Sequence, residues 1–395
     1  MPNRRSVITM LGSAAGAVLL PGAASAATSE SLKDIAARKG MRFGCAVGRH
    51  GDAGAGGRFA DTAYRRLVAR ECGMIVAEND TKWPALQPQP GPHRFAAADQ
   101  MFAWARERSM LVRGHTLLWQ ARRWLPDWVN QYDFGAAPAR VAERLMTEHI
   151  AAVCSHFGRA VFSYDVVNEA VDPGTGELIG NVLNQKMGAL EQIDLAFVLA
   201  RQHAPTAQLV YNDYMGPGAG SARHRAGVLA LLAALRARGT PVDALGLQSH
   251  IGNALPAAAT AAGSEWRKFL DQVSDMGYDL LITEFDVNDR QLPADVDARD
   301  AGVAAIARDY LDLTLSYPRC RDFLLWGMAD DVSWLQQWPE ARRADGLPQR
   351  CTPYDSELRA KPLRETIAYA LKVMPPRLNS AQGQLYRPDG PPPAR

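Results

Sequence analysis

Short apolar runs recur along the chain and alternate with longer stretches in which apolar residues return at a helical period. The short runs are almost entirely apolar, which is typical of strands buried on both faces of a parallel sheet. Eight of them predict strands, at Met41–Ala46, Gly73–Glu78, Leu111–Leu118, Val161–Asn168, Gln208–Asn212, Ala244–Gln248, Asp279–Thr283 and Asp322–Trp326. Amphipathic helices are predicted between them, for example at Ala139–Ala152, Leu190–Gln202, Arg223–Arg238 and Ala304–Ser316.

This alternation predicts the α/β class and one (β/α)8 barrel, the TIM barrel, over residues 32–373. An open doubly wound sheet is the alternative, and it would more typically carry a Gly-rich phosphate turn after its first strand. The segment Gly51–Gly57 lies after that strand, but its glycines lack the dinucleotide-binding spacing, so we interpret it as a loop. The barrel is therefore favoured.

The two ends of the chain differ from the part between them. Arg4-Arg5 precede an apolar stretch, Val7 to Leu20, and the small-residue site Ala24-Ser-Ala26. This pattern predicts a cleavable signal peptide over residues 1–26, with paired arginines that indicate the twin-arginine route. A membrane anchor is the alternative, but the stretch is short and rich in Gly and Ala. We expect an exported protein, periplasmic or secreted, with a Pro-rich disordered tail at 375–395.

Composition and charge exclude several classes of protein. The 395 residues are 47% hydrophobic and 22% charged, as in ordinary soluble domains. The formal net charge is +2, and no dense Lys/Arg run follows the leader, so nucleic acid is not an expected partner. No later stretch resembles a membrane span, and we expect a monomer that does not bind membranes after leader cleavage.

Cysteine spacing and the absence of several motifs argue against metal and cofactor chemistry. The five cysteines are far apart and include no Cys-x-x-Cys pair, so no metal is expected. Cys320 and Cys351 flank a long loop and are a candidate disulfide pair. The chain has no Walker loop, no Gly-x-Ser-x-Gly elbow and no His-Glu-x-x-His. We therefore expect no cofactor.

Polar and aromatic residues collect at the carboxyl ends of the predicted strands, which open to one mouth in a barrel. They are Glu78-Asn79, His115 with Trp119, Asn168-Glu169, Asn212-Asp213, Gln248 with His250, Glu284 with Asp286, and Trp326. Any one of them alone is more often a cap, a loop charge or a core residue. Their joint occurrence favours a binding site for a hydroxyl-rich ligand, because indole faces stack on sugar rings while amides and carboxylates bind hydroxyls.

Two of these residues, Glu169 and Glu284, suggest sugar-chain cleavage. At the ends of the fourth and seventh strands they would face each other across the mouth. A retaining glycosidase holds its two carboxyl groups about 5–5.5 Å apart, whereas an inverting one leaves room for a water between them. The sequence leaves this distance open.

Seven motifs occur in one order along the chain: Glu78-Asn-Asp-Thr-Lys-Trp83, Arg113-Gly-His-Thr-Leu-Leu-Trp119, Asp165-Val-Val-Asn-Glu169, Tyr211-Asn-Asp-Tyr214, Gln248-Ser-His250, Ile282-Thr-Glu-Phe-Asp286 and Trp326-Gly-Met-Ala-Asp330 with Ser333-Trp334. In these motifs the sequence resembles glycoside hydrolase family 10, the endo-β-1,4-xylanases. The resemblance covers roughly residues 32–373 and implies a retaining xylanase acting on xylan-type polysaccharide.

The resemblance also implies a role for each matching residue. Glu169 would be the general acid/base and Glu284 the nucleophile, while Asn168 would hold the sugar 2-hydroxyl. His250 would bind Glu284 and be oriented by Asp286. The remaining positions would bind or wall the sugars on the non-reducing side: Glu78, Asn79, Lys82, His115, Gln248, Trp119, Trp326 and Trp334. The charge of Glu284 is expected to raise the pKa of Glu169.

Some positions depart from the usual family pattern, and some alternatives stay open. Gln120 replaces a histidine, Tyr164 a tryptophan, Met215 begins an unusual Gly/Pro stretch, and Asp331 stands at an often basic position. The Met215 stretch affects the expected leaving-side subsites. A β-1,4-glucanase, a hydrolase of short decorated xylo-oligosaccharides and a non-catalytic carbohydrate-binding protein remain as alternatives, whereas dehydrogenases and metal hydrolases lack their motifs.

Overall fold

A closed parallel barrel forms the structured part of the chain. The structure, a computed structural model, describes residues 29–49, 58–252, 261 and 263–377. Eight strands surround the axis: β1 (Arg42–Val47), β2 (Met74–Ala77), β3 (Leu111–Trp119), β4 (Ser163–Asn168), β5 (Gln208–Asp213), β6 (Ala244–Leu247), β8 (Asp279–Asn288) and β9 (Cys320–Leu325). Neighbours pair in parallel, and the β6–β8 and β1–β9 pairings close the ring. The predicted TIM barrel is confirmed, and the open sheet is excluded.

All eight predicted strands are present, and one of them is longer than expected. Strand β8 continues to Asn288, because a short additional strand, β7 (His250–Gly252), pairs with residues 286–288. Glu284 therefore lies inside its strand and not directly after it, which corrects the sequence-based prediction. The extended strand also brings His250 opposite Asp286 in the register.

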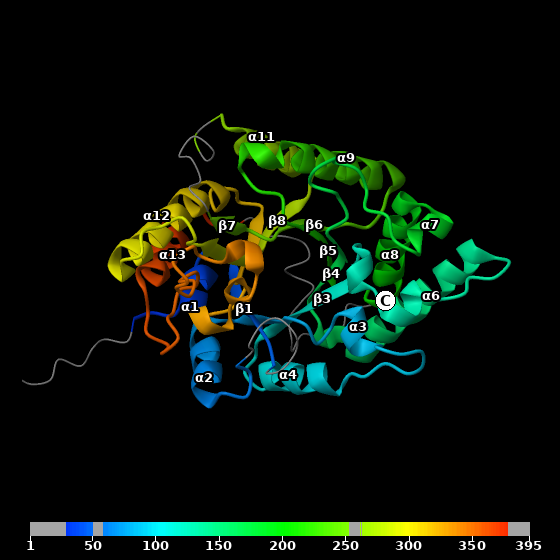
Figure 1. The fold of residues 1–395 in the computed structure, drawn as a ribbon, viewed down its shortest axis with the longest axis horizontal. Coiled ribbons are helices and arrows are strands. Elements are labelled where there is room, and N and C mark those ends of the chain that lie inside the picture. The colour runs from blue at the N-terminus through cyan, green and yellow to red at the C-terminus, as the bar shows by residue number, and fades with distance from the viewer. Residues whose placement is uncertain (1–28, 50–57, 253–260, 262, 378–395) are drawn as a thin grey trace, which may run out of the picture. The chain divides into compact units, whose positions relative to one another are not determined.

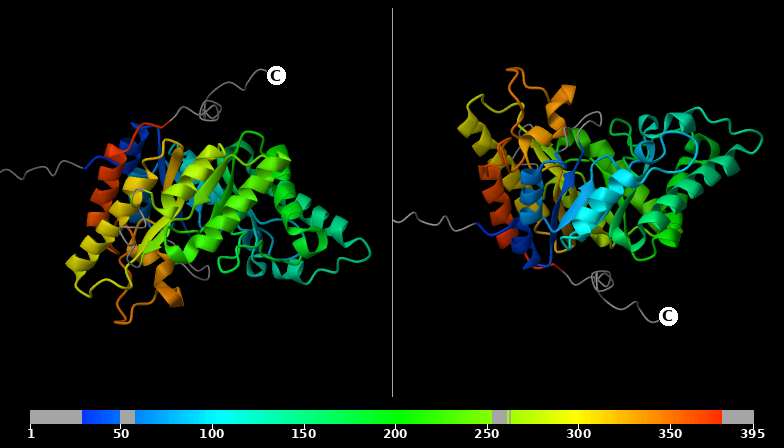
Figure 2. Two further views of the ribbon diagram at one scale, coloured as in Figure 1. Left: turned by 90° about the horizontal axis from the view of Figure 1, so that it is seen from above. Right: turned by 90° about the horizontal axis from the view of Figure 1, so that it is seen from below.

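Helices cover the outside of the strands, as Figure 1 shows. The α-helices are α1 (Leu32–Ala37), α2 (Thr62–Glu71), α3 (Trp83–Leu86), α4 (Ala96–Arg106), α5 (Asp127–Asn130), α6 (Pro138–Phe157), α7 (Asn184–Met187), α8 (Ala189–His203), α9 (Ala222–Arg238), α11 (Glu265–Asp275), α12 (Val296–Thr314) and α13 (Pro362–Val373). The four predicted helices correspond to α6, α8, α9 and α12. In the side views of Figure 2 the long connection from β9 to α13, drawn in orange, extends beyond the strands at one end of the barrel.

The helices bury one apolar face each against the strands. On α11 the buried residues Trp266, Phe269, Leu270 and Val273 follow the spacing of one helical face. The side chain of Ser264 caps the helix by accepting a hydrogen bond from the Arg267 backbone N–H. Burying each large apolar side chain contributes roughly 1.5–3 kcal/mol, so this face holds the helix in place.

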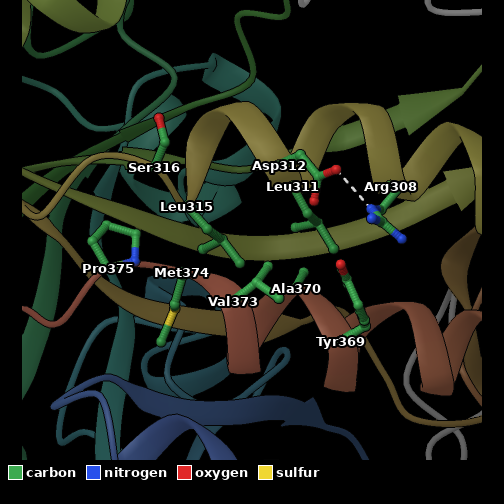
Figure 3. Close-up of a pocket in the computed structure, with 10 residues that line it drawn as sticks. All are labelled: Arg308, Leu311, Asp312, Leu315, Ser316, Tyr369, Ala370, Val373, Met374 and Pro375. Carbon is green, nitrogen blue, oxygen red and sulfur yellow. Dashed lines mark hydrogen bonds and ion pairs between the residues drawn. The ribbon is translucent and has the colours of Figure 1, made fainter.

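A cavity of about 270 Å³ lies between α12 and α13 (Figure 3). Arg308 and Asp312 of α12 pair with each other beside it, and the Arg308 guanidinium lies 4.1 Å from the ring centre of Tyr369 on α13. The cavity is near the C-terminal end of α12, which leads into the amino end of β9. It is therefore remote from the carboxyl ends of the strands.

Three sequence-based predictions fall wholly or partly outside the described residues: the leader at 1–26, the loop at 51–57 and the tail from 378 onward. The first residues of the expected tail are packed. Arg377 is buried, and its guanidinium donates to the carbonyls of Leu315 and Tyr317 at 3.1 and 2.6 Å.

The candidate disulfide between Cys320 and Cys351 is not present. All five cysteines are buried and free. Cys320 begins β9, at the amino end of the barrel, whereas Cys351 accepts a hydrogen bond from the Val287 N–H near the carboxyl end of β8. The two sulfur atoms therefore belong to opposite ends of the barrel. Within the described ranges no helix is long and apolar enough to cross a membrane, and no cluster of His, Cys, Asp or Glu is arranged to hold a metal ion.

Candidate active site

Glu169 follows β4 directly and is held in a defined direction. Its backbone is in the left-handed region, with φ 53°, and its N–H donates to the Asn212 carbonyl at 2.9 Å. The side chain accepts hydrogen bonds from Trp119 Nε1 at 2.9 Å and from Gln248 Nε2 at 3.0 Å. Neighbouring strands thus fix both the backbone and the carboxyl group at the mouth of the barrel.

The surroundings of Glu169 favour its protonated form. Burial is the main cause of the raised pKa of Glu169, and the negative charges of Asp213 and Glu284 add to it. The hydrogen bonds from Gln248 and Trp119 oppose the shift without cancelling it. The predicted direction is confirmed, but the charge of Glu284 is a minor cause and burial the major one.

Glu284 has the opposite bias. Its side chain is 5% exposed and accepts from Asn212 Nδ2 at 2.7 Å, while His250 Nε2 lies 3.3 Å from Oε2. Burial would raise the pKa of Glu284, but the hydrogen bond from His250 and the charges of His115 and His250 outweigh it and lower the pKa. The surroundings therefore favour the ionised form of Glu284 and the protonated form of Glu169.

His250 is held as a cation between two carboxylates. Its Nδ1 lies 3.0 Å from Asp286 Oδ2, and Asp286 also accepts a 2.7 Å hydrogen bond from Trp334 Nε1. Burial would lower the pKa of His250, but the charge of Asp286 and the contact with Glu284 raise it to about 10. The expected order Asp286–His250–Glu284 is present in the structure.

Asn212 is a central residue whose role the sequence reasoning missed. Its Nδ2 donates to Asn168 Oδ1 at 2.9 Å and to Glu284 Oε1 at 2.7 Å, and its Oδ1 accepts from Thr283 at 2.7 Å. A Cβ at Gly246 would lie only 2.2 Å from Asn212 Oδ1, so a larger residue there would displace the amide. Its position at the end of β5 was the available signal.

Asn168 is fully buried between the two glutamates. Its Oδ1 accepts from Asn212 and, at 3.3 Å, from Gln248 Nε2. Its Nδ2 has no hydrogen-bond partner among the described residues. The amide is thus oriented by its oxygen, and its N–H group remains available to a bound hydroxyl.

Indole rings line one side of the mouth. Trp119 stacks on Trp124 with ring centres 4.2 Å apart, and Lys82 Nζ lies 4.8 and 5.1 Å from the two ring centres. Lys82 also donates to Asn79 at 2.6 Å, and burial lowers its pKa despite the nearby carboxylates, first among them Glu78. Trp124 was not predicted, because it lies in a short 3-10 turn beyond the strand.

On the other side, rings surround the two histidines. His115 is 1% exposed, lies 5.2 Å from the ring centre of Trp326 and places Nδ1 2.9 Å from Asp165 and 4.0 Å from Glu284. Trp334 lies 4.9 Å from His250. The structure therefore brings together all thirteen predicted site residues, from Glu78 after β2 to Trp334 in the turn η5 (Trp334–Gln336).

Comparison with known proteins agrees with this geometry. The profile of glycosyl hydrolase family 10 matches residues 31–370. The chain belongs to glycosyl hydrolase family 10. It is 28% identical over 367 residues to endo-1,4-β-xylanase B of Neocallimastix patriciarum, an alignment that covers 91% of this chain and 38% of that protein. The chain thus spans less than half the length of that relative.

Two solved structures are similar in both fold and sequence. Native xylanase 10B from Thermotoga maritima has 26% identity and a TM-score of 0.75, over 87% of this chain and 98% of that chain. Xylanase 10B from Thermotoga petrophila in complex with xylobiose has 26% identity and a TM-score of 0.73, over 87% and 97%. Both alignments include nearly the whole of the compared chain.

Three of the four departures from the family 10 pattern are buried. Gln120 is fully buried and donates to Gln192 at 2.9 Å, in a cluster of amides. Tyr164 and Met215 are buried in the core, and Asp331 pairs with Arg58 at 3.3 Å. None of these four side chains hydrogen-bonds to Glu169 or Glu284 among the described contacts, so the pair keeps its surroundings.

Proposed function

We propose that this family 10 protein is an endo-1,4-β-xylanase that cleaves xylan-type polysaccharide with retention of configuration. The observation that carries the proposal is the opposite bias of two carboxyl groups in one hydrogen-bond network: the pKa of Glu169 is raised and that of Glu284 is lowered. The names of the similar proteins, all xylanases, support the substrate, as does the xylobiose held by the Thermotoga petrophila enzyme.

In the first step the Glu284 carboxylate attacks the anomeric carbon. The bond to the leaving sugar breaks as its oxygen takes the proton of Glu169, which yields a glycosyl ester on Glu284 and a free sugar end. His250 and Asn212 hold the attacking carboxylate through its two oxygens. We expect the two carboxyl groups to be about 5–5.5 Å apart in the working enzyme.

In the second step Glu169 acts as a base. Esterification removes the negative charge of Glu284, which lowers the pKa of Glu169, although burial and the charge of Asp213 remain. Glu169 then accepts a proton from a water molecule, which attacks the anomeric carbon and releases Glu284. Two inversions give net retention.

Asn168 would donate its available Nδ2 hydrogen to the 2-hydroxyl of the sugar being cleaved. Its oxygen is already bound by Asn212 and Gln248, so the amide is oriented before substrate arrives. Such a contact is expected to strengthen as charge develops on the sugar ring. Further sugars on the non-reducing side would be bound by Glu78, Asn79, Lys82, His115 and Gln248 and walled by Trp119, Trp326 and Trp334.

The decisive experiment replaces the nucleophile. Glu284→Ala should abolish xylan hydrolysis, and azide should partly restore cleavage with an inverted glycosyl azide as product, because a small anion then takes the vacated position. Glu265→Ala, which changes an exposed glutamate on α11, is the matched control and should keep full activity. Full activity of Glu284→Ala would contradict the proposal. Rates on xylan, carboxymethylcellulose and xylo-oligosaccharides would distinguish a xylanase from a glucanase or an oligosaccharide hydrolase.

We also propose that the protein acts outside the cytoplasm as a monomer, after removal of the leader at 1–26. Expression with Arg4 and Arg5 replaced by lysine should retain the protein in the cytoplasm, as measured by fractionation. Unchanged export of that variant would contradict the twin-arginine route.

A further inference from the structure

A short turn between β3 and α5 carries charge to the edge of the site. The 3-10 turn η1 (Arg122–Trp124) places Trp124 against Trp119, whose Nε1 donates to Glu169 at 2.9 Å. The Arg123 guanidinium lies 5.7 Å from the ring centre of Trp124. Two ring contacts and one hydrogen bond therefore connect Arg123 to the proposed acid/base.

The charge of Arg123 also reaches Tyr214. Burial and the charge of Glu169 raise the pKa of the Tyr214 hydroxyl, and the positive charge of Arg123 opposes this rise. Tyr214 follows β5 and is 39% exposed. Arg123 is therefore within electrostatic reach of both the indole wall after β3 and the residue after β5.

The positive charge of the turn is not neutralised by the protein. Arg122 and Arg123 are both exposed, and among the described residues neither forms an ion pair with a carboxylate. Lys82 adds a third cation beneath the two indoles, but it is buried and donates to Asn79. Of these three cations, the two arginines can therefore bind an anion from solvent without giving up an ion pair that the described part of the chain provides.

We propose that Arg123 binds the carboxylate of an acidic sugar substituent on the substrate. The chemical class is a uronic acid attached to the xylan backbone, bound next to the bond that is cleaved. This inference rests on the proposed function and specifies its substrate. A guanidinium suits this role because it presents two parallel donors to the two oxygens of a carboxylate.

The test compares two xylo-oligosaccharides that have the same backbone, one of them with a glucuronic acid branch. Arg123→Gln should lower kcat/KM for the acidic substrate by up to about fivefold, as expected for an exposed charge pair, and leave the neutral substrate unchanged. Arg123→Lys should keep part of the preference, since it retains the charge but not the paired donors. Added salt should reduce the preference of the wild type more than that of Arg123→Gln.

Arg106→Gln is the matched control, because Arg106 is exposed and ends α4 before the amino end of β3, at the opposite end of the barrel. It should change neither rate. An unchanged ratio of acidic to neutral rates in Arg123→Gln, or an equal loss on both substrates, would overturn the inference. A wild-type enzyme that cleaves neither substrate would instead overturn the proposed function.

Discussion

Two glutamates with the same side chain acquire opposite charge preferences from their neighbours. Burial and the charge of Asp213 favour the neutral acid at Glu169, and the hydrogen bonds from Gln248 and Trp119 oppose this without cancelling it. Glu284 faces His250 and His115, so the carboxylate is favoured. The residues around each glutamate therefore determine which one acts as the acid and which as the nucleophile.

The charge of Asp213 can be tested through the pH profile. Asp213 is fully buried and accepts from Tyr211 and from the Tyr214 N–H at 2.8 Å, with His224 Nε2 at 3.0 Å. Asp213→Asn removes a negative charge that raises the pKa of Glu169, so that pKa should fall. Because Glu169 must carry a proton to act as the acid, the basic limb of kcat/KM should move to lower pH. An unmoved basic limb in a variant with unchanged melting temperature would contradict this assignment.

His250 should control the acid limb in the same way. His250→Gln removes the positive charge that lowers the pKa of Glu284, so the pKa of Glu284 should rise. The nucleophile must be ionised, and the acid limb of kcat/KM should therefore move to higher pH. Asp345→Asn, on an exposed loop where Asp345 pairs with Arg343, is the control and should leave both limbs in place.

For single residues, the sequence predicted which side chains form the site better than it predicted their hydrogen-bond partners. Glu169, Glu284 and Asn168 were recognisable because each closes or follows an apolar run of the sequence within an ordered motif. The bridging position of Asn212 was not predictable, because its three partners come from β4 and β8 and are many residues away. Trp124 lacked a strand-end position and so gave no signal.

Helix α6 is held by a pair of hydrogen-bonded histidines as well as by its apolar face. His149 is buried on α6, stacks on Trp83 with ring centres 4.1 Å apart and shares a 3.0 Å hydrogen bond with His93. Its Nε2 lies 3.1 Å from the Leu117 carbonyl. One ring nitrogen of each histidine faces the other, so both rings cannot be protonated at their shared contact without repulsion.

Lowering the pH should therefore reduce the free energy of unfolding through the two histidines. Burial lowers the pKa of His149, and also that of His93, below the ordinary value. The unfolded chain then binds protons that the folded chain does not, so stability is complete above about pH 6.5 and falls as the pH decreases below it. The loss should approach roughly 1.4 kcal/mol per pH unit for His149, which is the fully buried one of the two. Urea midpoints at several pH values should show a shallower slope for His149→Gln than for the wild type; equal slopes would contradict the prediction.

Element boundaries were predictable where polarity changes sharply. The eight strands were found because each is an apolar run between polar segments. Strand β7 has only 3 residues, too few for a pattern, and the last part of β8 contains Asp286 and Asn288, which indicate a loop when read alone. These polar residues remain in a strand because β7 pairs with them. The hydrophobic periodicity of one segment gives no information on such pairing between segments.

At the scale of the whole molecule, the alternation of strands and helices cannot show that the sheet closes into a barrel. An open sheet has the same alternation. Closure depends on the pairings β6–β8 and β1–β9. Across the second of these, Arg42 of β1 forms an ion pair with the buried Asp322 of β9. The first and last helices of the barrel, α1 and α13, also pack against each other. Contacts between residues near opposite ends of the sequence therefore hold the ring together.

Glu71 is the clearest of these long-range contacts. It is fully buried at the end of α2, and its carboxylate accepts from the Leu32 N–H at 2.8 Å, from Tyr354 at 2.8 Å and from Arg364 of α13 at 3.3 Å. Glu71→Ala would leave the Arg364 guanidinium buried without this charge, and should lower the free energy of unfolding by about 3–5 kcal/mol.

The matched control changes the other carboxylate that Arg364 contacts. Glu365 is 68% exposed and pairs with Arg364 at 2.9 Å, so Glu365→Ala should cost less than about 1 kcal/mol. Because Glu71 ends α2 just before the amino end of β2, at the end of the barrel opposite to the site, kcat of both variants should equal that of the wild type at temperatures where they are folded. Similar urea midpoints for the two variants would contradict the prediction, because the buried charge of Glu71 would then contribute no more to stability than the exposed charge of Glu365.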